Sequence, residues 1–113
     1  MVTLTVGAVV LVPFPFSDLS RAKLRPALVL ADAGRGDWVL CQITSNPYAD
    51  LHAVMLNDVD FEIGPLRVKS YARPGKLFTA NETLIASQAG RLKPDSFARV
   101  LGAVIALLRS TSP

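Results

Sequence analysis

The chain has 113 residues, half of them apolar, and a formal net charge of +3. This length and composition favour one folded domain over residues 1–113 and argue against a disordered chain. A single cysteine and a single histidine exclude an internal disulfide and a zinc site of the Cys/His type. We therefore expect a protein of the reducing cytoplasm.

Short apolar runs, rich in β-branched residues and bounded by Pro, Gly, Asn and Asp, recur along most of the chain. This pattern is typical of a small antiparallel β-barrel. Gly34 and Gly36 predict a tight hairpin turn, and Pro26, which has no N–H to donate, is expected to begin a strand. We expect strands at residues 8–12, 27–30, 38–43, 53–56, 70–73 and 84–88.

Apolar residues recur at helical spacing at positions 97, 100, 101, 104, 105 and 108. Pro94 and Asp95 precede them and suit the first turn of a helix. We expect an amphipathic helix that packs on the barrel or on a second copy, because two arginines are too few for a membrane-surface helix. Residues 1–6 lack the features of a signal peptide, and residues 100–108 are too short to span a bilayer.

Seven of the twelve lysines and arginines fall into two loop-rich stretches, which could converge in one groove for an anionic partner such as nucleic acid. A solvated basic surface is the plain alternative. These cations are Arg21, Lys23, Arg25, Arg67, Lys69, Arg73 and Lys76.

No glycine-rich phosphate loop, paired-histidine metal site or G-x-S-x-G motif is present. Catalysis, if present, would therefore have to run without a metal site or a histidine base. RNA supplies its own nucleophile, the 2′-hydroxyl, so a protein can cleave it by aligning that group and stabilising the charged transition state. Arg25 offers a planar cation that binds two phosphate oxygens, and Thr44 offers a hydroxyl donor.

Each candidate also has a structural interpretation. An arginine beside a strand often makes only a surface ion pair, and a threonine at a strand end often satisfies local backbone. Strand alternation turns Cys41 toward the core, so we interpret it as a core residue and not as a nucleophile. His52 is expected in solvent and Trp38 inside the barrel, whereas an exposed Phe16 or Tyr48 could stack on a base.

Two short motifs, Arg25-Pro26 and Gln42-Ile43-Thr44-Ser45, resemble the signature of the MazF/PemK family of toxin endoribonucleases. The resemblance extends to residues 7–14, 23–30, 70–79, 84–85 and 90–92, and so covers nearly the whole chain. It departs from the family pattern at Ala8, where an acidic residue is common.

The resemblance implies a mainly β fold, an open antiparallel barrel of the Src-homology-three-like type with a C-terminal helix, assembled as a homodimer. It implies metal-independent, cofactor-free, sequence-specific cleavage of single-stranded RNA to 2′,3′-cyclic phosphate and 5′-hydroxyl ends. Arg25 would act in acid/base chemistry and charge stabilisation, and Thr44 would support it. An antitoxin with an acidic, disordered tail would regulate the toxin. The residues expected to bind RNA, some of them in a loop over the site, are Phe16, Ser17, Lys23, Ser45, Asn46 and Ser70.

Two other functions remain open. The same barrel could be a non-catalytic module that binds nucleic acid or a protein, although Arg25 and Thr44 argue against this. It could also be a CcdB-like gyrase poison, a class that acts through its terminal helix, but residues 107–111 show no obvious recognition surface.

Overall fold

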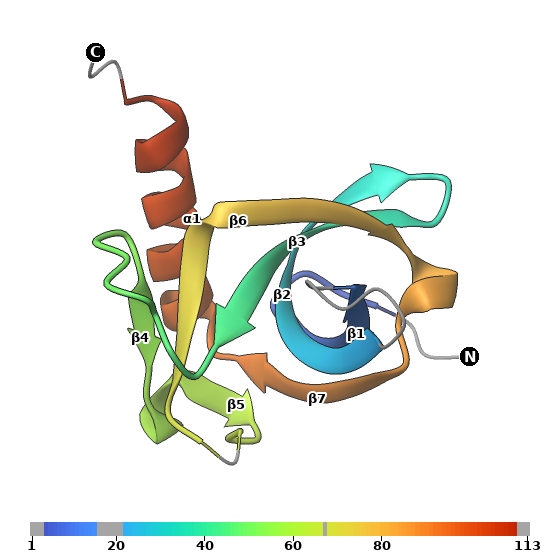
Figure 1. Cartoon of the computed structure of the whole chain (residues 1–113), viewed down its shortest axis with the longest axis horizontal. Coiled ribbons are helices and arrows are strands. Elements are labelled where there is room, and N and C mark those ends of the chain that lie inside the picture. Colours follow the sequence, from blue (N-terminus) through green and yellow to red (C-terminus); the bar gives the residue numbers. More distant parts are fainter. Residues whose placement is uncertain (1–3, 16–21, 67, 111–113) are drawn as a thin grey trace.

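Seven strands form a single antiparallel sheet in the order β4-β6-β3-β2-β1-β7-β5, and the sheet curls into a nearly closed barrel (Figure 1). The computed structural model describes residues 4–15, 22–66 and 68–110. Two single-turn 3₁₀ helices, Asp58–Asp60 and Glu82–Leu84, connect strands. The strands are β1 Ala8–Pro15, β2 Ala22–Gly34, β3 Asp37–Thr44, β4 Val54–Leu56, β5 Phe61–Ile63, β6 Ser70–Asn81 and β7 Ser87–Leu92.

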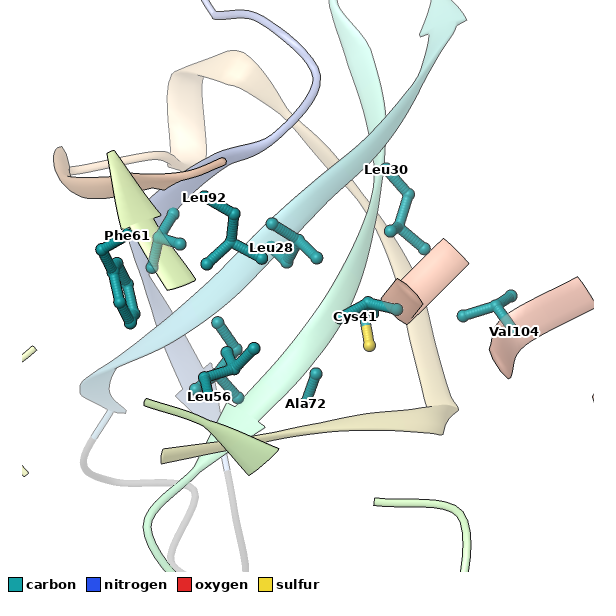
Figure 2. Close-up of a cluster of buried hydrophobic side chains, with 11 residues drawn as sticks. Leu28, Leu30, Cys41, Leu56, Phe61, Ala72, Leu92 and Val104 are labelled. Atoms are coloured by element: carbon teal, nitrogen blue, oxygen red, sulfur yellow. The ribbon is translucent and has the colours of Figure 1, made fainter. Parts of the chain in front are cut away.

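The central strands are buried on both faces, which explains their continuous apolar runs. One cluster, which includes Leu28, Cys41 and Val104, fills the space between the sheet and the C-terminal helix (Figure 2). A second cluster, which includes Val10 and Leu40, covers the other face, and Trp38 packs against it as predicted. Adjacent residues of β1 thus point into different clusters, and both clusters hold the strand in place.

The C-terminal helix, α1, spans Pro94–Leu108 as the periodicity predicts. Pro94 occupies its first turn, where its missing N–H leaves no bond unmade. Val100 and Val104 are buried against the sheet, whereas Ile105 and Leu108 are exposed. Within the described ranges, no helix is long and apolar enough to cross a membrane.

Strands β1, β2, β3 and β6 are longer than predicted, and the difference is largest for β2 and β6. β2 begins at Ala22, so Pro26 lies inside the strand, opposite Leu11, and the prediction that it begins the strand is wrong. Proline is tolerated there because pairing with β3 begins only at Ala27, so β2 is paired on one side. β6 continues past Pro74 and Gly75, where its register against β3 shifts and the strand turns a corner beside α1 (Figure 1).

Two further elements differ from the prediction. Residues 84–88 were expected as a strand, but β7 runs over Ser87–Leu92 and a 3₁₀ helix precedes it. The three-residue strand β5 was not predicted. The hairpin between β2 and β3 is confirmed: Arg35 and Gly36 both have positive φ, 56° and 82°, as a type I′ turn requires.

A buried carboxylate ties the start of α1 to the barrel. Asp60, 6% exposed, accepts hydrogen bonds from the Asn57 N–H at 2.7 Å and the Ser96 hydroxyl at 2.8 Å. Arg99 approaches the same carboxylate at 3.3 Å. Burial alone would raise the pKa of Asp60, but these three donors outweigh it and lower the pKa below its ordinary value of 3.8.

We expect Asp60→Asn to lower the free energy of unfolding by about 2–3 kcal/mol at neutral pH, because the buried donors lose a charged acceptor. Because the folded-state pKa is lowered, this stabilisation is present above the unfolded pKa and is lost as the pH falls through the folded pKa. Urea denaturation over a pH series measures it. The exposed neighbour Asp58, changed to Asn, is the matched control. A wild-type advantage that persists unchanged in strong acid would contradict the assignment.

Candidate functional site

The two predicted catalytic residues lie on neighbouring strands, Arg25 on β2 and Thr44 at the end of β3. Arg25 pairs with Val12 of β1, and in the β2–β3 ladder Ala27 pairs with Gln42. The β2–β3 ladder ends at this pair, and Arg25 and Thr44 each lie two residues beyond it. By strand alternation Arg25 shares a face with Ala27, and Thr44 shares a face with Gln42, so both residues lie on the same face of the sheet. Both residues are half-buried.

Arg25 does not precede a strand that begins at Pro26, as the sequence predicted. It lies within β2, with strand residues on both sides and a paired neighbour on β1. Its backbone is therefore fixed by the ladder. A rigid strand holds a functional side chain more accurately than a loop does.

Thr44 begins a row of paired side chains that runs through Tyr71 to Met55 at the edge of the sheet. Thr44 pairs with Tyr71 of β6, and Tyr71 pairs with Met55 of β4. Tyr71 is half-buried and Met55 is 41% exposed. Neither residue was predicted as part of the site. Tyr71 lies in the segment 70–79 that resembles the family, but only the strand register shows that it faces Thr44.

The Thr44 hydroxyl has local partners in this structure. Its Oγ1 donates to the Asn46 carbonyl at 3.0 Å and accepts from the Asn46 N–H at 3.1 Å. The hydroxyl thus closes the first turn of the loop at residues 45–53, as the structural interpretation anticipates. A hydroxyl hydrogen can rotate, so Oγ1 could donate to a phosphate oxygen by giving up the carbonyl.

The loop that follows Thr44 is held by a chain of short hydrogen bonds. The Asn46 side chain accepts from the Tyr48 N–H at 2.9 Å, and Asp50 accepts from the His52 N–H at 2.9 Å. Arg73 of β6 forms an ion pair with Asp50 at 2.9 Å. The hydrogen bonds from Arg73 and His52 lower the pKa of Asp50, so the carboxylate stays charged and compensates the charge of Arg73.

The other predicted RNA-binding residues are placed as follows. Ser45 and Asn46 are exposed beside Thr44, and Lys23 is exposed two residues before Arg25, on the same side of β2. Ser70 is 2% exposed, and its hydroxyl donates to the Val68 carbonyl. Tyr71 lies opposite Thr44, so the adjacent Ser70 points to the opposite face of the sheet. The structure therefore does not place Ser70 beside Thr44. Phe16 and Ser17 lie outside the described residues.

Cys41 and His52 lie where the sequence places them. Cys41 is fully buried, and its Sγ donates to the Arg73 carbonyl at 3.2 Å. Burial raises the pKa of the Cys41 thiol to about 12, so the thiolate that a nucleophile needs is not formed near neutral pH. His52 is exposed in the loop. In the described part of the chain, no three His, Cys, Asp or Glu side chains gather as ligands for a metal ion.

The comparison with known families decides the classification. A model of the PemK-like, MazF-like toxins of type II toxin–antitoxin systems matches residues 5–108. The chain belongs to this family. No curated protein matches this chain at a significant level.

Solved structures agree with this classification at the level of the fold. A MazE–MazF complex from Deinococcus radiodurans has a TM-score of 0.74 and 24% identity, over 95% of this chain and 97% of the other. A mycobacterial endoribonuclease in complex with its cognate antitoxin has a TM-score of 0.73 and 16% identity over 100% of both chains. The Mycobacterium tuberculosis toxin MazF-mt6 has a TM-score of 0.66 and 16% identity, over 86% of this chain and 91% of the other. The predicted barrel with a C-terminal helix is confirmed.

Proposed function

We propose that this PemK/MazF-family toxin is a sequence-specific endoribonuclease that cuts single-stranded RNA without a metal ion. The observation that supports the proposal is that Arg25 of β2 and Thr44 of β3 lie on the same face of the sheet, each two residues beyond the paired Ala27 and Gln42. Family membership supports it, as does the description of a mycobacterial protein of the same fold as an endoribonuclease.

The reaction needs few protein groups because the RNA provides the nucleophile. The 2′-oxygen bonds to the adjacent phosphorus, the bond from phosphorus to the 5′-oxygen breaks, and a 2′,3′-cyclic phosphate and a 5′-hydroxyl result. One proton leaves the 2′-oxygen for solvent, and another reaches the 5′-oxygen. Charge accumulates on the non-bridging oxygens in the transition state, where preorganised donors stabilise it most.

Arg25 and Thr44 are the proposed donors. The guanidinium of Arg25 offers several N–H donors and no acceptor, so it acts as a donor to the phosphate and to the leaving oxygen and not as a base. The Thr44 hydroxyl adds a second donor from the neighbouring strand. Lys23, Ser45 and Asn46 flank this pair and would bind the phosphates and bases on either side.

Family membership also supports a proposal for how this protein is regulated and assembled. The net charge of +3 suits an anionic partner, and relatives of this fold have been crystallised with their cognate antitoxin or with MazE. We propose that an antitoxin with an acidic tail covers the face that holds Arg25 and Thr44, and that the toxin acts as a cytoplasmic homodimer. The tail would order on binding, so its affinity would depend strongly on salt.

Cleavage of a long RNA by the purified protein tests the function. Primer extension should give discrete 5′ ends at a recurring short sequence, and those ends should accept a label from a polynucleotide kinase without prior phosphatase treatment. We expect cleavage to persist in excess EDTA, because the proposed mechanism has no metal step. RNA binding without cut ends would instead favour the non-catalytic module. Activity lost in EDTA and restored by Mg²⁺, on an RNA that folds without Mg²⁺, would contradict the mechanism.

A further inference from the structure

The loop after Thr44 displays an aromatic ring on the protein surface. Tyr48 is 68% exposed, although a tyrosine ring is one of the larger apolar surfaces a protein can bury. Its backbone has φ of +52°, and that of Ala49 has φ of +59°. Residues other than glycine, asparagine and aspartate rarely adopt this left-handed backbone conformation. Two successive residues in it raise the free energy of the folded state unless neighbouring contacts hold them in place.

The surroundings do hold this loop. The Thr44 hydroxyl binds both backbone polar groups of Asn46, and the Asn46 side chain accepts from the Tyr48 N–H. The Asp50 N–H then donates to the Pro47 carbonyl at 2.9 Å. A continuous set of contacts therefore runs from the Thr44 hydroxyl to the backbone that carries the Tyr48 ring. These contacts fix the backbone that carries the ring relative to Thr44.

One face of the ring already has a partner. The guanidinium carbon of Arg73 lies 5.6 Å from the centroid of the Tyr48 ring, within the range of a cation–π contact. Arg73 is itself fixed by its ion pair with Asp50, and the side chains of these two residues are only 17% and 13% exposed. The pair is thus largely enclosed, while the ring above it stays open to solvent.

From this arrangement we infer that the Tyr48 ring is a stacking platform for one RNA base next to the scissile phosphate, with Arg73 and Asp50 as its support. Single-stranded RNA is recognised largely by stacking of unpaired bases on aromatic side chains. A preorganised ring loses little conformational freedom on binding, so more of the stacking energy appears as affinity. The inference rests on the proposed function and adds a base-binding residue to it.

The alternative is that the Tyr48 ring only shields the ion pair. Both roles predict some loss of stability in Tyr48→Ala, so stability alone does not separate them. We therefore use a short RNA that spans a mapped cut site and carries a 2′-deoxy nucleotide at the scissile position, which blocks cleavage. Affinity for this RNA and the single-turnover rate on the cleavable RNA are measured together with thermal unfolding.

For Tyr48→Ala we expect affinity for the blocked RNA to fall roughly 10- to 100-fold, the range for losing one stacked base. The cleavage rate at saturating RNA should change much less. Tyr48→Phe keeps the ring and should bind within about threefold of wild type. Leu51→Ala is the matched control, because Leu51 is in the same loop, is 97% exposed and should not affect binding.

A second measurement identifies the base. Each nucleotide of the blocked RNA is replaced in turn by an abasic one, and each RNA is bound to wild type and to Tyr48→Ala. At one position the abasic RNA should weaken binding to wild type but cause little further loss in Tyr48→Ala. Equal losses in both proteins at every position would overturn the inference, and so would wild-type affinity of folded Tyr48→Ala. A wild-type protein that does not cut RNA would instead refute the proposed function.

Discussion

Arg25→Ala is expected to lower the single-turnover rate of RNA cleavage by at least about 10³-fold. The variant loses a bidentate donor to the phosphate at the moment when charge accumulates, and removal of even one such donor typically costs about 10²–10³-fold. Arg25→Lys should also be strongly impaired, because a point charge cannot replace the planar guanidinium fork. The ladder with β1 holds the backbone, so the melting temperature should fall by only a few degrees.

Arg35→Asn is the matched control for Arg25→Ala. It removes the same charge from an exposed position in the β2–β3 turn, at the opposite end of the hairpin from Thr44, and asparagine tolerates the positive φ of that turn. It should cleave at nearly the wild-type rate. If Arg25→Ala and Arg35→Asn lower the rate equally, Arg25 acts only through its contribution to the net positive charge of the protein. Wild-type activity in Arg25→Ala would remove Arg25 from the mechanism.

Thr44→Val should lower the single-turnover rate by about 10²-fold at saturating RNA, because the shape is kept and one transition-state donor is lost. RNA affinity should change little, since a neutral hydroxyl adds little to phosphate-driven binding. The structure adds a second consequence. The hydroxyl also closes the loop through Asn46, so we expect a loss of about 1 kcal/mol in the free energy of unfolding.

Thr44→Ser separates the two roles of the hydroxyl. Serine keeps the donor and the loop contact, so its rate and stability should both lie close to wild type. The rates are expressed per folded molecule, with the folded fraction taken from thermal unfolding of the same samples. If Thr44→Val melts at a lower temperature but its corrected rate equals that of wild type, Thr44 is a loop cap and has no part in the reaction.

The sequence was sufficient to predict the elements whose signals are local. The apolar runs of β1, β2 and β3 identify these strands because each run is buried on both faces, and the helical spacing of residues 97–108 identifies α1. The position of Cys41 in the core also follows from simple alternation. Arg25 and Thr44 were chosen from the chemistry of their side chains and from their place in short motifs, and they remain predictions until cleavage is measured.

The tertiary structure alone decided which distant segments meet. β5 lies beside β7, and β6 lies between β3 and β4, because strand pairing depends on the shape of the whole sheet and not on the sequence near each strand. The breaker Pro74-Gly75 bends β6 without ending it, since its neighbours on both sides still pair with β3. The positions of Tyr71 opposite Thr44 and of Arg73 beneath the Tyr48 ring depend on this pairing. No local pattern in the sequence contains that information.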